Sequence, residues 1–342
     1  MDNQDKKVRR LLSYAIVTLT VAVLLAMPLY LKRERESVTY TKMLMGTVLQ
    51  ITLAEGDAKR FDIAAEKAFD ETRRLEALFS SYMPESDVSK ISNSAGNGLV
   101  TVSPDVITVL KVAVKAAELS DGAFDPTVGA LGKVWGYSGE RRYVPTKEEV
   151  GRVLPLVDYR GILIDDASMK AGLRKKGMVL NLGGIAKGYI VSRAVEALQR
   201  EGVERGIIHA GGDMVVFQKK GPGQSPFKIG IQHPREKRLL GEVDLYNGAV
   251  STSGDYERYF VKDGVRYHHI LDPSTGFPAD RCRSVTIIAE DPTMADALST
   301  AVFVLGPEKG MALIEGLDGV EGVIVDSNGK VTASKKFKGK VF

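Results

Sequence analysis

Cysteine and histidine are both scarce in this chain, and their scarcity limits the chemistry that it can support. Cys282 is the single cysteine among 342 residues, so no intramolecular disulfide can form. One thiolate is also too few for a cysteine-based zinc site. The chain has four histidines, and two of them, His268 and His269, are adjacent. The polar stretch 251–300 around this pair is therefore a candidate for chemistry rather than for packing.

The body of the chain has almost no net charge. The formal charge is +4, but residues 1–36 hold seven of the 47 basic and four of the 43 acidic residues. No basic stripe with interleaved aromatic residues follows, so the sequence indicates no nucleic-acid partner. Hydrophobic residues make up 44% and charged residues 26% of the chain, which is typical of one large globular domain or two closely associated ones.

A long uncharged run occurs only near the N-terminus. Residues 11–31 contain no charged side chain, and 21 residues can cross a bilayer as one helix. Basic residues precede the run, which favours a cytoplasmic N-terminus. The run is not followed by an A-x-A cleavage site, so a cleaved signal peptide is not favoured. It is also not followed by a cysteine to which a lipid could be attached. We expect a cytoplasmic segment at 1–10, a transmembrane signal anchor at 11–31, a linker at 32–37, and a body at 38–342 on the periplasmic side of the inner membrane.

The hydrophobic pattern of the body predicts helices and strands that do not alternate strictly. Helices are predicted at 57–79, 103–119, 188–200, 291–304 and 307–314. Strands are predicted within 38–53 and 162–180, and at 207–209, 214–218, 227–232, 241–246, 256–261, 285–289, 320–326 and 331–333. Residues 80–103 are predicted as a long ordered loop. This order favours an α+β fold with mixed layers of largely antiparallel sheet over a doubly wound sheet.

Two patterns could hold a metal ion or a phosphate. Asp296 and Thr300 share one face of a predicted helix, and their oxygens are ligands that Mg²⁺ or Ca²⁺ prefers. The alternative is a helix in which Asp296 pairs with an arginine and Thr300 bonds a backbone carbonyl. Residues 181–189 place a Gly-Gly pair and Lys187 at a helix start, where free amides bind anions. The alternative there is a tight turn that requires glycine.

The adjacent histidines predict one candidate base. Side chains alternate along a strand, so the rings of His268 and His269 should point to opposite faces. One of them could act as a general base, or both could be satisfied strand histidines. Tyr82, in the long loop, could stack on a purine or isoalloxazine ring or simply pack the loop. Residues 251–255 contain three hydroxyls and an acid but no G-x-S-x-G elbow, so a serine hydrolase is poorly supported.

In their order along the chain, these clusters resemble the ApbE family of FAD:protein FMN transferases, over roughly residues 40–335. The segments that carry the resemblance are 45–47 (MGT), 79–82 (FSSY), 122–129 (GAFDPTVG), 182–188 (LGGIAKG), 211–213 (GGD), 252–256 (TSGDY), 269–276 (HILDPSTG) and 295–301 (ADALSTA).

The resemblance implies an extracytoplasmic enzyme with an α+β fold related to tunnelling-type folds. It would move the FMN moiety of FAD, with Mg²⁺, to a Thr or Ser hydroxyl of an acceptor protein and release AMP. The acceptor would be a flavin-carrying subunit of a membrane redox complex. A Mg²⁺-dependent FAD pyrophosphatase and a non-catalytic, membrane-tethered flavin-binding protein are the alternatives.

The resemblance also implies site residues. Mg²⁺ would be held by Asp296, Thr300 and the Ala186 carbonyl, and His269 or Asp255 would accept the hydroxyl proton. The FAD site would be lined by Met45, Tyr82, Ala123, Phe124, Asp125, Gly183, Lys187 and Ile270. Asn181 stands where the family usually has Asp, which puts a metal role at that position in doubt.

Overall fold

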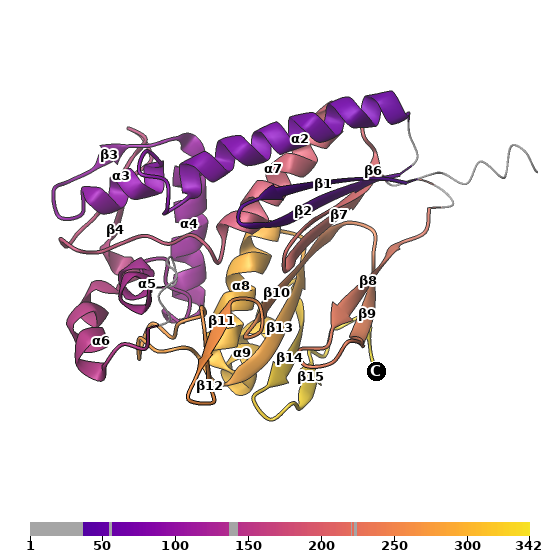
Figure 1. The fold of residues 1–342 in the computed structure, drawn as a ribbon. Helices are drawn as coiled ribbons and strands as arrows, with labels where there is room; N and C mark the ends of the chain where they lie inside the picture. The colour runs from indigo at the N-terminus through magenta and orange to yellow at the C-terminus, as the bar shows by residue number, and fades with distance from the viewer. Residues whose placement is uncertain (1–36, 55–56, 137–142, 220, 222–223) are drawn as a thin grey trace, which may run out of the picture.

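An antiparallel sheet flanked by helices forms one lobe of the chain, and a smaller, mainly helical lobe lies beside it (Figure 1). The computed structural model describes residues 37–54, 57–136, 143–219, 221 and 224–342. The helices are α2 (Ala58–Phe79), α3 (Asp87–Asn93), α4 (Pro104–Leu119), α5 (Gly129–Trp135), α6 (Lys147–Val153), α7 (Ala186–Arg200), α8 (Pro292–Leu305) and α9 (Pro307–Glu315).

The strands, given in chain order, belong to four sheets. They are β1 (Val38–Leu44), β2 (Thr47–Leu53), β3 (Val100–Thr101), β4 (Ile162–Asp165), β5 (Lys170–Leu173), β6 (Arg205–Ala210), β7 (Asp213–Gln218), β8 (Phe227–Gln232), β9 (Leu239–Leu245), β10 (Gly248–Gly254), β11 (Tyr259–Lys262), β12 (Val265–His268), β13 (Cys282–Ala289), β14 (Glu321–Asp326), β15 (Val331–Ala333) and β16 (Lys340–Val341). The largest sheet has the order β1-β2-β6-β7-β10-β13-β14-β15, and every neighbouring pair in it is antiparallel. The predicted α+β fold with largely antiparallel sheet is confirmed.

Both faces of the large sheet are covered. Helices α2, α7 and α8 pack on one face around the main hydrophobic core, and the small sheet β16-β9-β8 packs on the other (Figure 1). Because side chains alternate along a strand, Ile287 of β13 enters the core under the helices while Ile288 enters the core under the small sheet. The central strands therefore hold a fixed register, which matters because β10 also carries polar site residues.

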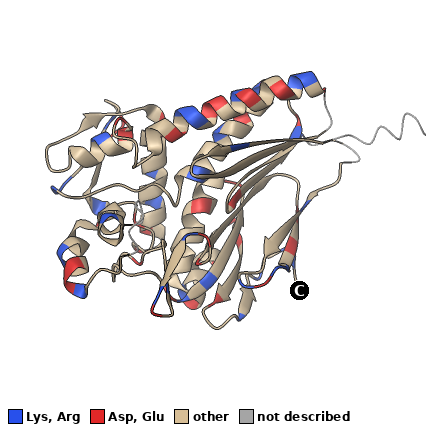
Figure 2. Ribbon diagram, viewed as in Figure 1, with Lys and Arg blue, Asp and Glu red and all other residues tan. Residues whose placement is uncertain are grey.

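Helix α8 joins the two lobes. Leu298 and Val302 belong to the core of the large sheet, whereas Ala297 and Ala301 belong to the core of the helical lobe around α4. The helix is thus apolar on two sides, and its polar residues are confined to the remaining stripe. Figure 2 shows that charges of both signs are interspersed over the described part of the chain, as the balanced composition predicts.

The five helices predicted above are confirmed within two residues of their predicted ends, but the strand predicted at 256–261 begins only at Tyr259, and two larger differences concern α3 and β10. Residues 80–103 are not one loop, because α3 forms there with Ser86 as its N-cap and with Val88 and Ile91 buried. Two buried apolar residues in seven are too weak a period to read from sequence. Strand β10 was also missed, because its sequence (GAVSTSG) is rich in glycine and hydroxyl residues.

The predicted transmembrane helix at 11–31 lies outside the described residues. Among the helices that the structure does describe, none combines the length and the apolar character needed to cross a bilayer.

Substitution of Gly188 tests the close packing of α7 on α8. A Cβ at Gly188 would lie 2.1 Å from the Pro292 carbonyl oxygen, so Gly188→Ala should lower the free energy of unfolding by about 1–3 kcal/mol. Gly151 of α6 is the matched control, because a Cβ there meets nothing within 4 Å. Gly151→Ala should change stability by less than about 1 kcal/mol, and in the stabilising direction. Thermal unfolding of both variants is the measurement, and equal midpoints would contradict the packing described.

Candidate active site

The site begins where the first turn of α7 touches α8. The Gly188 amide donates a hydrogen bond to Asp296 Oδ2 at 3.1 Å. Asp296 is 2% exposed, so its carboxylate is fixed against the N-terminal end of α7. The free amides at a helix N-terminus carry partial positive charge, which stabilises a carboxylate there.

Lys187 lies between two buried carboxylates. Its ammonium donates to Asp213 Oδ2 and lies 3.4 Å from Asp296 Oδ1. Burial opposes the charge of Lys187, but the two carboxylates outweigh it and raise the pKa of the ammonium. Burial, followed by repulsion from Asp213, raises the pKa of Asp296 to about 7. The cluster thus holds two carboxylates for one ammonium.

Hydroxyl groups surround the carboxylates on the side of β10. Ser251 donates to Asp213 Oδ1, and the Ser253 hydroxyl lies 2.8 Å from the Ser299 hydroxyl and 3.3 Å from Thr300 Oγ1. Thr300 lies one turn after Asp296 on α8, as its spacing predicted. A Cβ added at Gly184 would lie 3.0 Å from Thr300 Oγ1, so the Gly-Gly turn before α7 passes directly over this hydroxyl.

The two adjacent histidines have different environments, as alternation predicted. His268 is 5% exposed, its Nε2 bonds the Ala279 carbonyl at 2.7 Å, and its ring packs edge-on against Phe303. His269 is exposed, and its Nδ1 lies 3.2 Å from the Arg258 carbonyl. A carbonyl oxygen only accepts, so Nδ1 of His269 carries the proton and Nε2 keeps a free lone pair.

The environment of His269 keeps its ring neutral. Desolvation of the ring by the atoms packed around it, followed by repulsion from His268, Arg258 and Lys187, lowers its pKa to about 4. A neutral imidazole with a free Nε2 can accept a proton at pH 7. The residue as a whole is exposed, so a substrate hydroxyl can approach it from solvent.

Comparison with known proteins identifies the family. The model of the ApbE family matches residues 45–324. A FAD:protein FMN transferase of Klebsiella pneumoniae (strain 342) is 33% identical over 299 residues, which cover 86% of this chain and 91% of that protein. The chain belongs to the ApbE family.

Solved structures of the family have the same fold. The ApbE protein of Thermotoga maritima matches with a TM-score of 0.83 and 40% identity, over 89% of this chain and 98% of that one. The flavin transferase ApbE from Vibrio cholerae matches with a TM-score of 0.77 and 29% identity, over 89% of this chain and 99% of that one.

Among the residues that the ApbE resemblance predicts for the FAD site, Met45 is linked to His269 through Arg258. It occupies the turn between β1 and β2 with φ of 55°, and its amide donates to Glu76 Oε1 at 2.9 Å. The next residue, Gly46, accepts a 3.3 Å hydrogen bond from Arg258, whose own carbonyl bonds His269. One arginine therefore links this turn to the candidate base.

Phe124 and Gly183 lie at the other end of the predicted FAD site. The Phe124 ring would be 3.4 Å from a Cβ at Gly184, so it lies over the same turn as Thr300. Gly183 is exposed, and its amide bonds Asn181 Oδ1 at 2.8 Å. Asn181 therefore shapes the turn through its acceptor oxygen, a role that does not need the carboxylate usual in the family.

The remaining predicted FAD residues divide between loop and core. Asp125 accepts hydrogen bonds from Thr127 and from the Tyr159 amide, which closes the loop that Ala123 begins. Ile270 is 6% exposed and packs in the main core. Tyr82 is 65% exposed on the loop that follows α2, where its ring is accessible.

Asp255 lies in an ion pair that makes it a poor base. Both of its oxygens accept from Arg235, at 2.7 and 2.5 Å, and Oδ1 also lies 3.2 Å from Arg266. Two guanidinium groups stabilise the ionised carboxylate and occupy its lone pairs. This geometry favours His269 over Asp255 as the proton acceptor.

Sequence reasoning missed Asp213, which is 3% exposed and holds Lys187. A signal was present, because Asp213 follows a Gly-Gly pair and opens an otherwise apolar strand (DMVVFQ). A carboxylate at the start of a buried strand requires a partner. The roles of Ser251, Ser253 and Ser299 depend on the pairing of β10 with α8, which spacing alone does not reveal.

The two histidines should respond differently to substitution. His268→Ala should lower the free energy of unfolding by about 1–3 kcal/mol, because it leaves the buried Ala279 carbonyl without its donor. His269→Ala should change stability by less than about 0.5 kcal/mol, because the residue as a whole is exposed. Thermal unfolding of both variants checks this, and a larger loss for His269→Ala would reverse the roles of the two rings.

Proposed function

We propose that this chain transfers the FMN moiety of FAD to a Thr or Ser hydroxyl of an acceptor protein and releases AMP. Several curated ApbE relatives bear the name FAD:protein FMN transferase. The observation that carries the proposal is the convergence of Asp296, Thr300 and Lys187 at the Gly-Gly turn, with the neutral base His269 within range of the Lys187 charge.

The donor set at this point fits Mg²⁺. Asp296 and Thr300 offer a carboxylate and a hydroxyl oxygen, and the Ala186 carbonyl lies in the backbone segment that holds Asp296. No group of three or more His, Cys, Asp or Glu side chains is arranged for a metal in the described ranges, so hydroxyl and carbonyl oxygens would complete the site. Such oxygens suit Mg²⁺ better than zinc. When bound, Mg²⁺ would neutralise negative charge on the pyrophosphate of FAD.

Side chains of this protein would stabilise the developing charge and accept the proton. Lys187, held by Asp213, would lie beside the pyrophosphate and stabilise the charge that develops there. The acceptor hydroxyl would attack the flavin-side phosphorus and give its proton to Nε2 of His269. The bond from that phosphorus to the bridging oxygen breaks, AMP leaves, and FMN remains as a phosphoester. The Arg258 carbonyl keeps Nε2 available throughout.

The N-terminal segment supports a location for this reaction. The uncharged run 11–31, preceded by basic residues, would anchor the chain in the inner membrane with the body on the periplasmic side. The acceptor would then be a flavin-carrying subunit of a redox complex at the same membrane.

A transfer assay tests the function. The chain is incubated with FAD, Mg²⁺ and the acceptor protein that the related Vibrio cholerae enzyme modifies, and mass spectrometry looks for a covalent FMN adduct. Asp296→Asn should reduce the rate at least about 100-fold, because it removes a charged donor from the reacting end of the site. Arg238→Ala, a change in the turn between β8 and β9, is the control. Free FMN without an adduct would support a pyrophosphatase, and tight FAD binding without AMP release would support a non-catalytic protein.

The pH dependence of transfer should report His269. The base acts in its neutral form, and its pKa is lowered to about 4, so protonation removes activity only at low pH. At saturating Mg²⁺, kcat/KM should stay constant from pH 8 to about pH 5 and then fall with a midpoint near pH 4. A fall centred near pH 7 would contradict the assignment. His269→Ala should reduce kcat by about 10²–10⁴-fold.

Membrane anchoring should depend on the run 11–31. The full chain should remain with membranes after an alkaline carbonate wash. Leu24→Asp combined with Leu25→Asp should release it, because a charge at the helix centre costs about 2.5–3.5 kcal/mol. Membrane retention of this double variant would exclude the anchor.

A further inference from the structure

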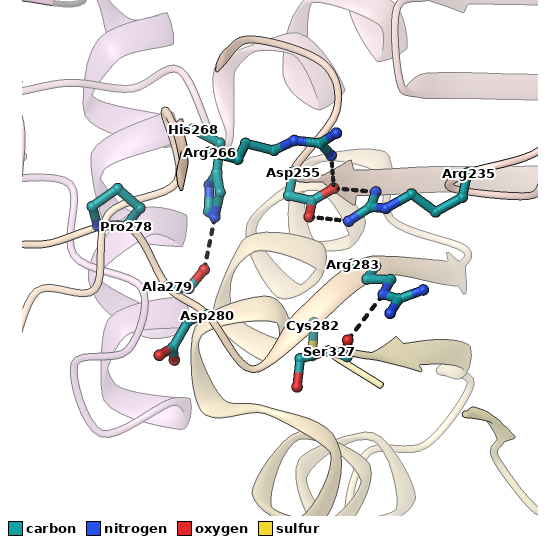
Figure 3. Close-up of a pocket in the computed structure, with 10 residues that line it drawn as sticks. All are labelled: Arg235, Asp255, Arg266, His268, Pro278, Ala279, Asp280, Cys282, Arg283 and Ser327. Carbon is teal, nitrogen blue, oxygen red and sulfur yellow. Dashed lines mark hydrogen bonds and ion pairs between the residues drawn. The ribbon is translucent and has the colours of Figure 1, made fainter. Parts of the chain in front are cut away.

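A polar pocket lies just past the end of β10, the strand that carries Ser253. It has a volume of about 330 Å³, and three arginines, Arg235, Arg266 and Arg283, line it together with His268 (Figure 3). Arg235 and Arg266 lie on one side with Asp255, and Arg283 lies with Ser327 on another. This volume is at the small end of ligand pockets and suits a side chain or a small anion rather than a dinucleotide.

The pocket carries unused positive charge. Asp255 forms ion pairs with Arg235 and Arg266, and Asp280 is the other carboxylate that lines the pocket. The side chain of Arg283 makes one hydrogen bond within the described residues, from Nε to the Ser327 carbonyl at 3.0 Å. Its two Nη groups remain available as donors, and a guanidinium fork of this kind binds a carboxylate or a phosphate in a bidentate manner.

The pocket is reachable from solvent. The side chains of Arg235 and Arg266 are 32% and 31% exposed, so they are partly desolvated yet accessible to a ligand that arrives from outside. Cys282, in contrast, lines the pocket from a buried position, and burial raises the pKa of its thiol to about 12. The pocket therefore suits anion binding rather than thiol chemistry.

Two strands connect this pocket to the reacting groups. Strand β10 carries Ser253, which touches Thr300, and the chain then reaches Asp255 in the pocket after two residues, or about 7 Å. Strand β12 ends with His268 in the pocket wall, and the next residue is His269. The rings of His268 and His269 lie on opposite faces of this strand end, so an acceptor segment whose hydroxyl reaches His269 would pass round the end of β12 and place a residue several positions away against the arginines.

We propose that this pocket binds an acidic side chain of the acceptor protein and so positions the acceptor hydroxyl at His269. The inference rests on the proposed FMN transfer. The acceptor carboxylate would bind the Nη groups of Arg283, while Arg235 and Arg266, fixed by Asp255, form the opposite wall. The phosphates of FAD are a second source of negative charge, but Lys187 and the start of α7 already provide for them in a separate cluster.

Steady-state transfer kinetics test the proposal, with the acceptor protein of the Vibrio cholerae enzyme as the probe. Arg283→Gln keeps the size of the side chain and removes its charge, so it should raise the KM for the acceptor by about 10- to 100-fold. Its KM for FAD should stay unchanged. Arg283→Glu should raise the acceptor KM further, because it places a carboxylate against a carboxylate. Arg238→Ala, outside the pocket, should leave both KM values unchanged.

A matched change in the acceptor identifies the partner group. Each Asp or Glu near the residue that receives FMN is replaced in turn by its amide. One replacement should raise the KM of the wild-type enzyme about as much as Arg283→Gln does, and it should have no further effect in that variant. Unchanged FAD kinetics show that the variants are folded.

The outcomes separate this proposal from the function on which it rests. Wild-type transfer with an unchanged acceptor KM in Arg283→Gln would overturn the pocket proposal alone. A rise in the FAD KM instead would overturn it in favour of a subsite for an FAD phosphate. No adduct with the wild-type enzyme would refute both.

Discussion

Two carboxylates, Asp213 and Asp296, are buried together, and this is tolerable only because Lys187 lies between them. An unpaired buried charge destabilises a fold by several kcal/mol, so the position of one ammonium constrains three elements at once. β7 supplies Asp213, α8 supplies Asp296, and the start of α7 supplies the ammonium of Lys187. The packing of Gly188 on α8 holds these elements at the required distance.

This constraint also explains why the polar groups lie where they do. Helix α8 buries apolar residues in both lobes, so Asp296, Ser299 and Thr300 share the stripe that remains and face β10. The same strand ends near the arginine-lined pocket. Phosphate chemistry and recognition of the acceptor would therefore use neighbouring positions at the C-terminal end of one strand, while His269 follows a separate hairpin and is hydrogen-bonded to the Arg258 carbonyl.

The sequence predicted those parts of the site that recur at regular spacing. Asp296 and Thr300 lie four residues apart on a strongly apolar helix, and alternation separated the environments of His268 and His269, while the choice of His269 came from the resemblance to the ApbE family. The contacts between residues far apart in the sequence could not be predicted from it. The contacts of Lys187 with Asp213, of Asp255 with Arg235, and of Ser253 with Thr300 each join segments 20 or more residues apart. Such pairs depend on sheet order, which local periodicity does not encode.

The same reason accounts for the elements that were missed in the prediction of the fold. Strand β10 has glycine and hydroxyl residues in place of the β-branched run that marks a strand, because its polar side chains serve the site. Helix α3 is held by caps and by two buried residues rather than by a long apolar stripe. In both cases tertiary contacts outweigh local preference. The apolar periods of α2, α4 and α8, in contrast, were sufficient because each helix faces a large core.

The central claim is that the carboxylate cluster forms the metal and phosphate end of a flavin-transfer site. Anomalous diffraction from a crystal of this chain grown with Mn²⁺ in place of Mg²⁺ tests it most directly. The account predicts a single strong peak in contact with Asp296 and Thr300, and its loss in Asp296→Asn. A peak bound elsewhere, or one that persists in that variant, would contradict it.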